Sequence, residues 1–236
     1  GQEVSILAFV DGEEVLPMAP AQDYKRIGDG DTGPNTGGMG SYSPVPVMPE
    51  EEYIRAVEDI LRPTAAALAA RGIHYKGILY AGLIMTGDGP KVLEYNVRFG
   101  DPEVQAVLPR LESDLMEPML AVQEGRLGEV ELRWRQDPCV TVVAASGGYP
   151  TDYKKGFPIS GLEEAGSMDG VTVFHAGTKL GDDGEVLTNG GRVLNVSALG
   201  PDFASARENA YRAVDKIAFS DIYFRKDIAL RTLEVE

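Results

Sequence analysis

Cysteine, histidine and tryptophan are scarce in this chain of 236 residues, which holds one cysteine, two histidines and one tryptophan. With Cys139 alone, no disulfide can form within the chain, and this suits the reducing cytoplasm, where we expect the protein. One cysteine, His74 and His175 do not make up a zinc site of the usual four-ligand kind. We therefore expect both histidines to be hydrogen-bonded structural residues.

Long apolar runs are also missing. No stretch approaches the roughly 18 consecutive apolar residues of a membrane span, and no basic segment precedes an apolar one as in a signal peptide. The chain starts with Gly1 rather than methionine, and its first residues resemble a strand interior, so we expect further residues upstream. The content of 43% hydrophobic and 25% charged residues is typical of a folded globular protein.

Positive charge is the third deficit, because 22 lysines and arginines stand against 37 aspartates and glutamates, a formal net charge of −15. Such a chain repels phosphate backbones, so we expect neither nucleic acid nor an anionic membrane as partner. An anionic small substrate would need specific cations, and the candidates are few: Lys25-Arg26, Arg98, Lys154-Lys155, Lys179, Arg192 and Arg225-Lys226. The P-loop, the G-x-G-x-x-G turn before a helix and the G-x-S-x-G elbow are absent.

The apolar pattern predicts an α+β fold with domains spanning residues 1–133 and 134–236. In the first part we expect a hairpin (4–10 and 15–18) with a type I′ turn at Asp11-Gly12, and a helix (49–71) divided by Pro63. Two strands (77–86 and 91–99) and a helix with Asp101 as N-cap should follow. The second part should hold strands at 140–145, 171–176, 185–187 and 192–197, and an amphipathic helix capped by Asp202.

The sharpest chemical signal is the sequence LEYNVRF at residues 93–99. Side chains alternate along a strand, so Glu94, Asn96 and Arg98 should share one face, with neighbours about 6–7 Å apart. A carboxylate and an amide at this spacing could share one Mg²⁺ with substrate phosphates, and the arginine could neutralise a phosphate. Gly82 on the neighbouring strand would leave room for a nucleotide. A solvent-facing polar stripe explains the same pattern.

Residues 22–49 form a glycine- and proline-rich segment that is too long for a simple connection, which indicates a functional or a disordered loop. It contains Asp23 and Lys25, and glycines such as Gly37 and Gly38 could bring backbone N–H groups close to an anion. A flexible surface loop is the plain alternative.

In the second part, Lys179 and Arg192 each stand beside a glycine-rich turn. Cations at such turns could bind an anionic substrate. Two ordinary hairpins with surface cations explain the pattern equally well.

Six segments, in this order, closely resemble the phosphoribosylamine–glycine ligases, which are glycinamide ribonucleotide synthetases of the ATP-grasp superfamily. They are QDYKRIGDGDTGPNTGGMGSYSP (22–44), YAGL (80–83), LEYNVRFGDPE (93–103), SGGYP (146–150), FHAGTK (174–179) and NGGRV (189–193). The first and third are highly specific. The resemblance implies that residues 1–133 form the C-terminal half of an ATP-grasp fold, an antiparallel sheet flanked by helices. Residues 134–236 would form a small α+β domain that binds a substrate phosphate.

The resemblance also implies a reaction in de novo purine biosynthesis. Glycine would take the γ-phosphoryl group of ATP, and the amine of 5-phosphoribosylamine would displace phosphate to give glycinamide ribonucleotide. Glu94 and Asn96 match the family's ligands for Mg²⁺ or Mn²⁺. Arg98 and Asp23 would be catalytic, and the substrate-binding residues would be Asp23, Lys25, Gly37, Gly38, Arg98, Asp101, Lys179 and Arg192.

Two features of this family are not found in the sequence. The strand at 77–86 offers no acidic metal ligand, so the number of metal ions stays open. The N-terminal domain and the first half of the ATP-grasp region would lie upstream of Gly1. We therefore expect this chain alone to lack ligase activity, and the complete protein to be a monomer. Another ATP-grasp purine ligase or carboxylase, and a noncatalytic phosphosugar- or nucleotide-binding module, remain alternatives.

Overall fold

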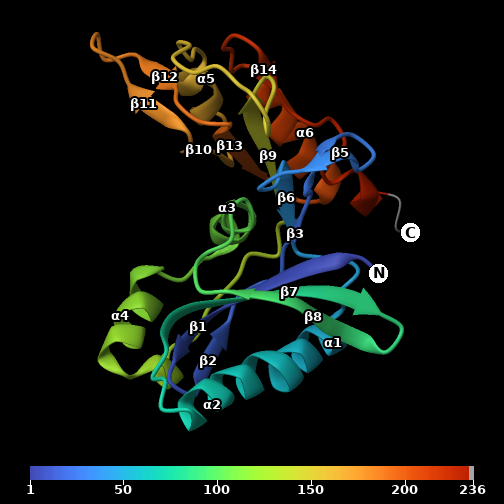
Figure 1. Ribbon diagram of the computed structural model, residues 1–236, viewed down its shortest axis with the longest axis vertical. Coiled ribbons are helices and arrows are strands. Elements are labelled where there is room, and N and C mark those ends of the chain that lie inside the picture. The colour runs from blue at the N-terminus through green and yellow to red at the C-terminus, as the bar shows by residue number, and fades with distance from the viewer. Residues whose placement is uncertain (234–236) are drawn as a thin grey trace. The chain divides into compact units, whose positions relative to one another are not determined.

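The computed structural model describes residues 1–233, which pack as two compact units (Figure 1). The first unit comprises Gly1–Gln22 and Ser43–Arg135, and the second comprises Asp23–Tyr42 and the chain from Gln136 onward. The first domain predicted from the sequence, residues 1–133, includes the segment Asp23–Tyr42. It belongs to the second unit because its tyrosines, Tyr24 and Tyr42, pack in the core of that unit.

The first unit is built on a four-stranded antiparallel sheet in the order β2-β1-β7-β8. Its strands are β1 (Glu3–Asp11), β2 (Glu14–Pro17), β7 (Lys76–Thr86) and β8 (Gly89–Asn96). The predicted hairpin and strand pair are confirmed. The hairpin turn, however, is formed by Gly12 and Glu13, and only Gly12 has a positive φ, so the turn is not of type I′.

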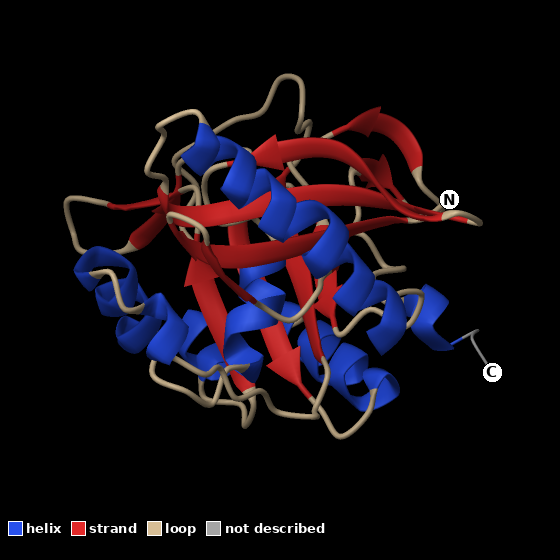
Figure 2. Ribbon diagram, turned by 90° about the horizontal axis from the view of Figure 1, so that it is seen from below, coloured by secondary structure: helices blue, strands red, loops and turns tan. Residues whose placement is uncertain are grey.

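Helices cover both faces of this sheet, and Figure 2 shows the α1–α2 helix running across the strands. Helix α1 (Glu50–Ala56) and helix α2 (Arg62–Ala70) are joined by a π-helical turn, Val57–Leu61. The predicted division at Pro63 is confirmed. Pro63 lies in the first turn of α2, where a missing N–H costs least, and the wider π turn precedes it.

The opposite face of the sheet packs against a second group of helices. They are α3 (Glu103–Val107), α4 (Met116–Glu124) and two short 3₁₀ turns, Leu108–Arg110 and Leu127–Glu129. The prediction of Asp101 as the N-cap of α3 is wrong, because Pro102 occupies that position. Asp101 stands one residue too early, and its Oδ1 accepts a 3.1 Å hydrogen bond from Gln105 Nε2.

The second unit holds a six-stranded sheet in the order β10-β13-β9-β6-β3, with β14 also paired to β9. Its strands are β3 (Gln22–Asp23), β6 (Gly40–Ser43), β9 (Cys139–Ser146), β10 (Val171–His175), β13 (Arg192–Leu199) and β14 (Ile222–Tyr223). Two small hairpins accompany the sheet: β4 (Arg26–Gly28) with β5 (Thr32–Asn35), and β11 (Thr178–Leu180) with β12 (Val186–Thr188). The glycine-rich segment is therefore folded into short strands.

Helix α6 (Phe203–Val214) packs its alanine-rich face on this sheet, accompanied by α5 (Leu162–Gly166) and a 3₁₀ turn, Leu230–Leu233. The predicted cap is confirmed, since Asp202 Oδ1 accepts a 2.7 Å hydrogen bond from the backbone N–H of Ser205. Across residues 1–233, no helix combines the length and apolar character needed to cross a membrane.

Candidate functional site

Glu94 and Asn96 lie side by side at the end of β8. Asn96 Nδ2 donates a hydrogen bond of 3.2 Å to Glu94 Oε1. In the β7–β8 register they stand opposite Gly82 and Tyr80, and residues opposite each other in an antiparallel pair share a face. Leu93 is the extra residue of a β-bulge that precedes Glu94. The prediction that Glu94 and Asn96 share a face is confirmed.

Gly82 makes room for this pair of side chains. A Cβ atom at Gly82 would lie 3.1 Å from Glu94 Cγ, which is tighter than ordinary van der Waals contact. Strand β7 therefore has a glycine at the position against which the Glu94 side chain packs. The space that we expected for a nucleotide at this position is used, at least in part, by Glu94 itself.

Arg98 does not join Glu94 and Asn96 on the strand face. Strand β8 ends at Asn96, and the backbone bends at residues 97 and 98. The guanidinium of Arg98 is exposed, and its Nη1 donates a 2.8 Å hydrogen bond to the carbonyl oxygen of Phe99. Our placement of Arg98 in the strand is wrong, because alternation does not continue past the bend.

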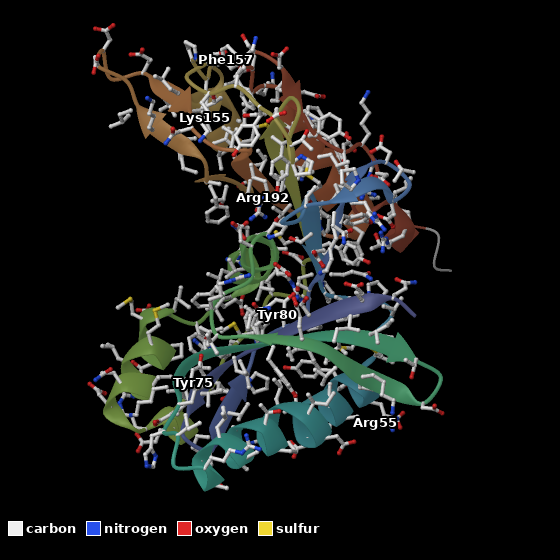
Figure 3. All side chains as sticks on the ribbon, viewed as in Figure 1. Arg55, Tyr75, Tyr80, Lys155, Phe157 and Arg192 are labelled. Carbon is white, nitrogen blue, oxygen red and sulfur yellow. The ribbon has the colours of Figure 1, made fainter. Side chains whose placement is uncertain are left out.

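A buried hydroxyl–carboxylate network lies beside this pair, and the sequence did not reveal it. Tyr80, labelled in Figure 3, hydrogen-bonds Ser5 Oγ at 2.7 Å and donates to Glu103 Oε1 at 2.7 Å. Glu103 is only 4% exposed. A Cβ atom at Gly100 would lie 2.6 Å from the Glu103 carboxylate, so the turn after Arg98 rests directly on this network.

The donor atoms of Glu94 and Asn96 fit a hard divalent cation. Mg²⁺ prefers oxygen ligands and is commonly held by one or two carboxylates together with substrate phosphates. A turn of the Asn96 amide would present Oδ1 in place of Nδ2 on the side of Glu94. Within residues 1–233, no cluster of three or more His, Cys, Asp or Glu side chains is arranged to hold a metal ion.

A second group of candidate residues gathers around Arg192, labelled in Figure 3, in the second unit. Arg192 Nη1 donates a 2.7 Å hydrogen bond to the carbonyl oxygen of Gly37, and the Gly37 N–H donates to the Tyr149 hydroxyl at 3.0 Å. The Tyr149 ring lies against Gly191, where any Cβ atom would collide with it. We call Gly37, Tyr149, Gly191 and Arg192 the Arg192 cluster.

The backbone N–H groups of Gly37 and Gly38 are engaged within the protein. Gly38 donates a hydrogen bond of 2.9 Å to Thr36 Oγ1, just as Gly37 donates to Tyr149. The two N–H groups that we expected to approach an anion thus have hydrogen-bond partners within the protein. Their carbonyl oxygens face the Arg192 guanidinium, at 2.7 Å from Gly37 and 3.5 Å from Gly38.

Asp23 and Lys25 form an ion pair in the same unit. Lys25 Nζ lies 3.0 Å from Asp23 Oδ1 and 3.1 Å from Oδ2. The side chain of Asp23 is 6% exposed and that of Lys25 is 38% exposed, so the carboxylate is buried while the lysine side chain is partly exposed to solvent. These two predicted residues are brought together.

Lys179 is exposed on β11. The turn before it is attached to Arg192, because the Gly177 N–H donates to the Arg192 carbonyl at 2.9 Å. His175 Nδ1 lies 3.0 Å from Thr178 Oγ1, so the prediction of a hydrogen-bonded His175 is confirmed.

The fold is of the ATP-grasp type, and comparisons with known proteins agree with this class. Residues 1–104 match the domain family described as "Phosphoribosylglycinamide synthetase, ATP-grasp (A) domain". Residues 139–231 match "Phosphoribosylglycinamide synthetase, C domain". The chain belongs to the phosphoribosylglycinamide synthetase family.

Curated relatives agree with this assignment. The chain is 53% identical to the phosphoribosylamine–glycine ligase of Caldanaerobacter subterraneus subsp. tengcongensis, with 97% of the chain and 54% of the relative covered. It is 52% identical to the ligase of Escherichia coli strain K12, with coverage of 100% and 55%. The chain thus spans about half the length of the curated relatives that it matches.

Solved structures give the same result. The crystal structure of phosphoribosylamine–glycine ligase from Thermotoga maritima matches with a TM-score of 0.86 and 36% identity, covering 97% of this chain and 56% of that one. The biotin carboxylase domain of a thermophilic 2-oxoglutarate carboxylase matches with a TM-score of 0.65 over 94% of this chain and 48% of that one. At 13% identity, this second likeness concerns the fold alone.

Proposed function

We propose that this chain is the part of a phosphoribosylamine–glycine ligase that holds the metal ion and the acceptor phosphate. The reaction joins glycine to 5-phosphoribosylamine at the expense of ATP and yields glycinamide ribonucleotide, ADP and phosphate. The observation that carries the proposal is the contact of Glu94 with Asn96 beside Gly82, in a chain of this family. The full-length form, meaning this chain extended to the length of its relatives, would carry the activity, and the chain alone would be inactive.

Glu94 and Asn96 are proposed to hold Mg²⁺ or Mn²⁺ together with the phosphates of ATP. When bound, the ion would neutralise charge on the phosphoryl group in transfer. A related structure, a biotin carboxylase domain from Hydrogenobacter thermophilus, was solved with magnesium ADP. Tyr80 and Glu103 would keep the end of β8 and the start of α3 in fixed positions beside these ligands.

Arg98 is proposed to neutralise phosphate charge from the turn that follows β8. An exposed guanidinium on a turn can reorient toward an anion more easily than one locked in a strand. Asp101 would assist from the start of α3, where its carboxylate also accepts a hydrogen bond from Gln105.

In the second unit, Arg192 and Lys179 are proposed to bind the phosphate of 5-phosphoribosylamine. Gly37 and Gly38 orient the Arg192 guanidinium through their carbonyl oxygens. Asp23 would take part near the substrate amine and glycine, and Lys25 would orient its carboxylate through their ion pair. Residues 1–133, apart from the segment Asp23–Tyr42, would form the catalytic domain, and the remainder would bind the sugar phosphate.

The test is an assay of ADP release by the full-length form, with glycine, 5-phosphoribosylamine or ATP omitted in turn. We expect ADP release only when all three are present, with glycinamide ribonucleotide formed in equal amount. Release that needs bicarbonate instead of glycine would point to a carboxylase, and binding of nucleotide without any turnover would point to a noncatalytic module. We further propose a cytoplasmic, monomeric enzyme, which size-exclusion chromatography and cell fractionation would check.

A further inference from the structure

Arg225 is a fully buried cation, with 0% of its surface exposed. Its Nε and Nη2 donate to the two carboxylate oxygens of Asp227 at 2.7 and 2.6 Å. Its Nη1 donates to Asp31 Oδ1 at 2.9 Å and to the Arg26 carbonyl oxygen at 3.0 Å. A buried charge is costly unless it is paired and hydrogen-bonded. Arg225 is therefore paired inside the protein. It does not serve as a cation for an anionic substrate, a role for which the sequence makes it a candidate.

The same guanidinium packs on the ring of Tyr24. The Arg225 Cζ atom lies 4.7 Å from the ring centroid, and the Cζ atom of Arg231 lies 4.0 Å from it. Both distances are within the roughly 6 Å range of a cation–π interaction. Arg231 Nη2 also reaches Asp31 Oδ2 at 3.2 Å, so two arginines and Asp31 hold this ring in the core.

Tyr24 stands between Asp23, which is proposed to act near the substrate amine, and Lys25, which pairs with the Asp23 carboxylate. Because the ring of Tyr24 is held in place, the backbone of its neighbours Asp23 and Lys25 is held in place as well. Arg225 also binds the carbonyl of the next residue, Arg26. The Lys25 carbonyl in turn accepts hydrogen bonds from the N–H and Oγ1 of Thr36, at 2.7 and 2.9 Å.

Thr36 leads directly to Gly37, whose carbonyl oxygen orients Arg192. A continuous set of contacts thus runs from Arg225 through Tyr24 and Arg26 to both ends of the segment at residues 23–38. We call this segment the acceptor loop. None of these contacts involves the Glu94 and Asn96 pair, which belongs to the first unit.

We infer that Arg225 is a positioning residue of the acceptor loop, which acts through Tyr24 and Arg26 to set the binding geometry for 5-phosphoribosylamine. The inference rests on the proposed function for the identity of the substrate. A purely structural arginine would change stability alone. A positioning arginine would change the KM for the acceptor and the order of the loop, while the KM for ATP stays constant.

The experiment compares the Arg225→Met and Arg225→Lys variants of the full-length form with the unchanged protein. We expect Arg225→Met to raise the KM for 5-phosphoribosylamine about tenfold or more, the change that losing one charge-assisted hydrogen bond corresponds to. Arg225→Lys keeps the positive charge but loses the planar guanidinium with its several N–H donors, so it should give an intermediate KM for 5-phosphoribosylamine. The KM for ATP should not change. Arg212→Met is the matched control, because Arg212 is an exposed arginine of the same unit.

A second variant covers the case in which Arg225→Met does not fold. The Asp31 side chain is 52% exposed, so Asp31→Asn neutralises the acceptor-loop partner of Arg225 and Arg231 and leaves Asp227 in place. It should raise the KM for 5-phosphoribosylamine, as Arg225→Lys does. Combined with Arg225→Lys, its effect should be less than additive, because both changes act on one contact.

Amide hydrogen exchange separates failure of this inference from failure of the proposed function. The N–H groups of Thr36 and Met39 bond the carbonyls of Lys25 and Tyr24, and in the Arg225 and Asp31 variants they should exchange faster. The amide of Val196, in the core strand β13, should keep its rate. An inactive unchanged protein would overturn the proposed ligase and not the positioning role. Unchanged exchange of the loop amides, or a normal acceptor KM in an active enzyme, would overturn the role of Arg225.

Discussion

Arg192 Nη1 donates a 2.7 Å hydrogen bond to the carbonyl oxygen of Gly37, which precedes it by 155 positions in the chain. The contact brings a cation of β13 and a glycine of the acceptor loop into one cluster. A Cβ atom at Gly37 would lie 2.9 Å from the Cζ and Nη2 atoms of Arg192. A side chain at position 37 would therefore displace the Arg192 guanidinium that Gly37 orients.

Gly37→Ala should displace the Arg192 guanidinium and leave the fold intact. Because the clash involves the end of a flexible side chain, we expect the free energy of unfolding to change by no more than about 0.5 kcal/mol. The KM for 5-phosphoribosylamine should rise several-fold in the full-length form. Gly166→Ala is the control, since a Cβ atom there meets nothing within 4 Å. Equal kinetics for the two variants would argue against the orienting role of Gly37.

Lys179→Ala should raise the KM for 5-phosphoribosylamine about tenfold or more, because a charge-assisted hydrogen bond to phosphate is worth about 1.5–3 kcal/mol. The KM for ATP should stay nearly constant, as the variant leaves Glu94 and Asn96 untouched. Steady-state kinetics with each substrate varied in turn checks this. Lys154→Ala removes another exposed lysine and should have no effect. Normal acceptor kinetics for Lys179→Ala would refute the phosphate role.

Glu94→Gln should lower kcat about 100-fold or more, since removal of a group that stabilises transition-state charge commonly costs this much. A neutral amide binds a divalent cation more weakly than a carboxylate does, so raised Mg²⁺ should restore part of the rate. The measurement is kcat as a function of Mg²⁺ concentration. Glu112→Gln, at an exposed glutamate of the same unit, is the control. A metal dependence identical to that of the unchanged enzyme would remove Glu94 from the site.

Tyr80→Phe should lower the free energy of unfolding by about 1–3 kcal/mol, because it leaves the buried Ser5 hydroxyl and Glu103 carboxylate without a shared partner. Urea denaturation of the chain measures this. Tyr95→Phe is a matched control, since the Tyr95 hydroxyl bonds Thr64 at an exposed position and Tyr95 is 43% exposed. We expect it to cost less than about 0.5 kcal/mol. Similar losses in the two variants would contradict a special role for the buried network.

Acid should weaken the second unit through Asp227. Burial raises the pKa of Asp227, but hydrogen bonds from Arg225 and the Gly30 N–H outweigh it and lower the pKa from 3.8 to about 2. The folded state therefore binds this proton less readily than the unfolded chain. The stabilisation is complete above pH 4 or so and is lost as the pH falls toward 2.

The size of this acid effect should be on the order of 2 kcal/mol. Urea unfolding between pH 5 and pH 2 would measure it, with Asp227→Asn as the comparison. The variant should be less stable at neutral pH and should show a shallower loss of stability in acid. Parallel pH profiles for the two proteins would exclude Asp227 as the titrating group.

Much of the local structure followed from sequence because it depends on neighbours in the chain. The Asp202 cap needs only a side chain and an N–H three residues later, and both are present. Alternation placed Glu94 and Asn96 on one face for the same reason. The Asp101 cap and the position of Arg98 could not be obtained this way. They depend on where a strand stops and a helix starts, and in the structure the turn between those two points packs on Glu103.

The α+β class, the family resemblance and the shared strand face of Glu94 and Asn96 could be inferred from the sequence, since periodicity and local spacing are properties of the chain. The assignment of the segment Asp23–Tyr42 to the second unit and the burial of Arg225 became visible in the folded protein alone. The same holds for the contact of Gly37 with Arg192. These contacts join residues far apart in sequence. The role of a buried charge, or of a glycine that lacks a Cβ atom, can be inferred only when its neighbours in space are known.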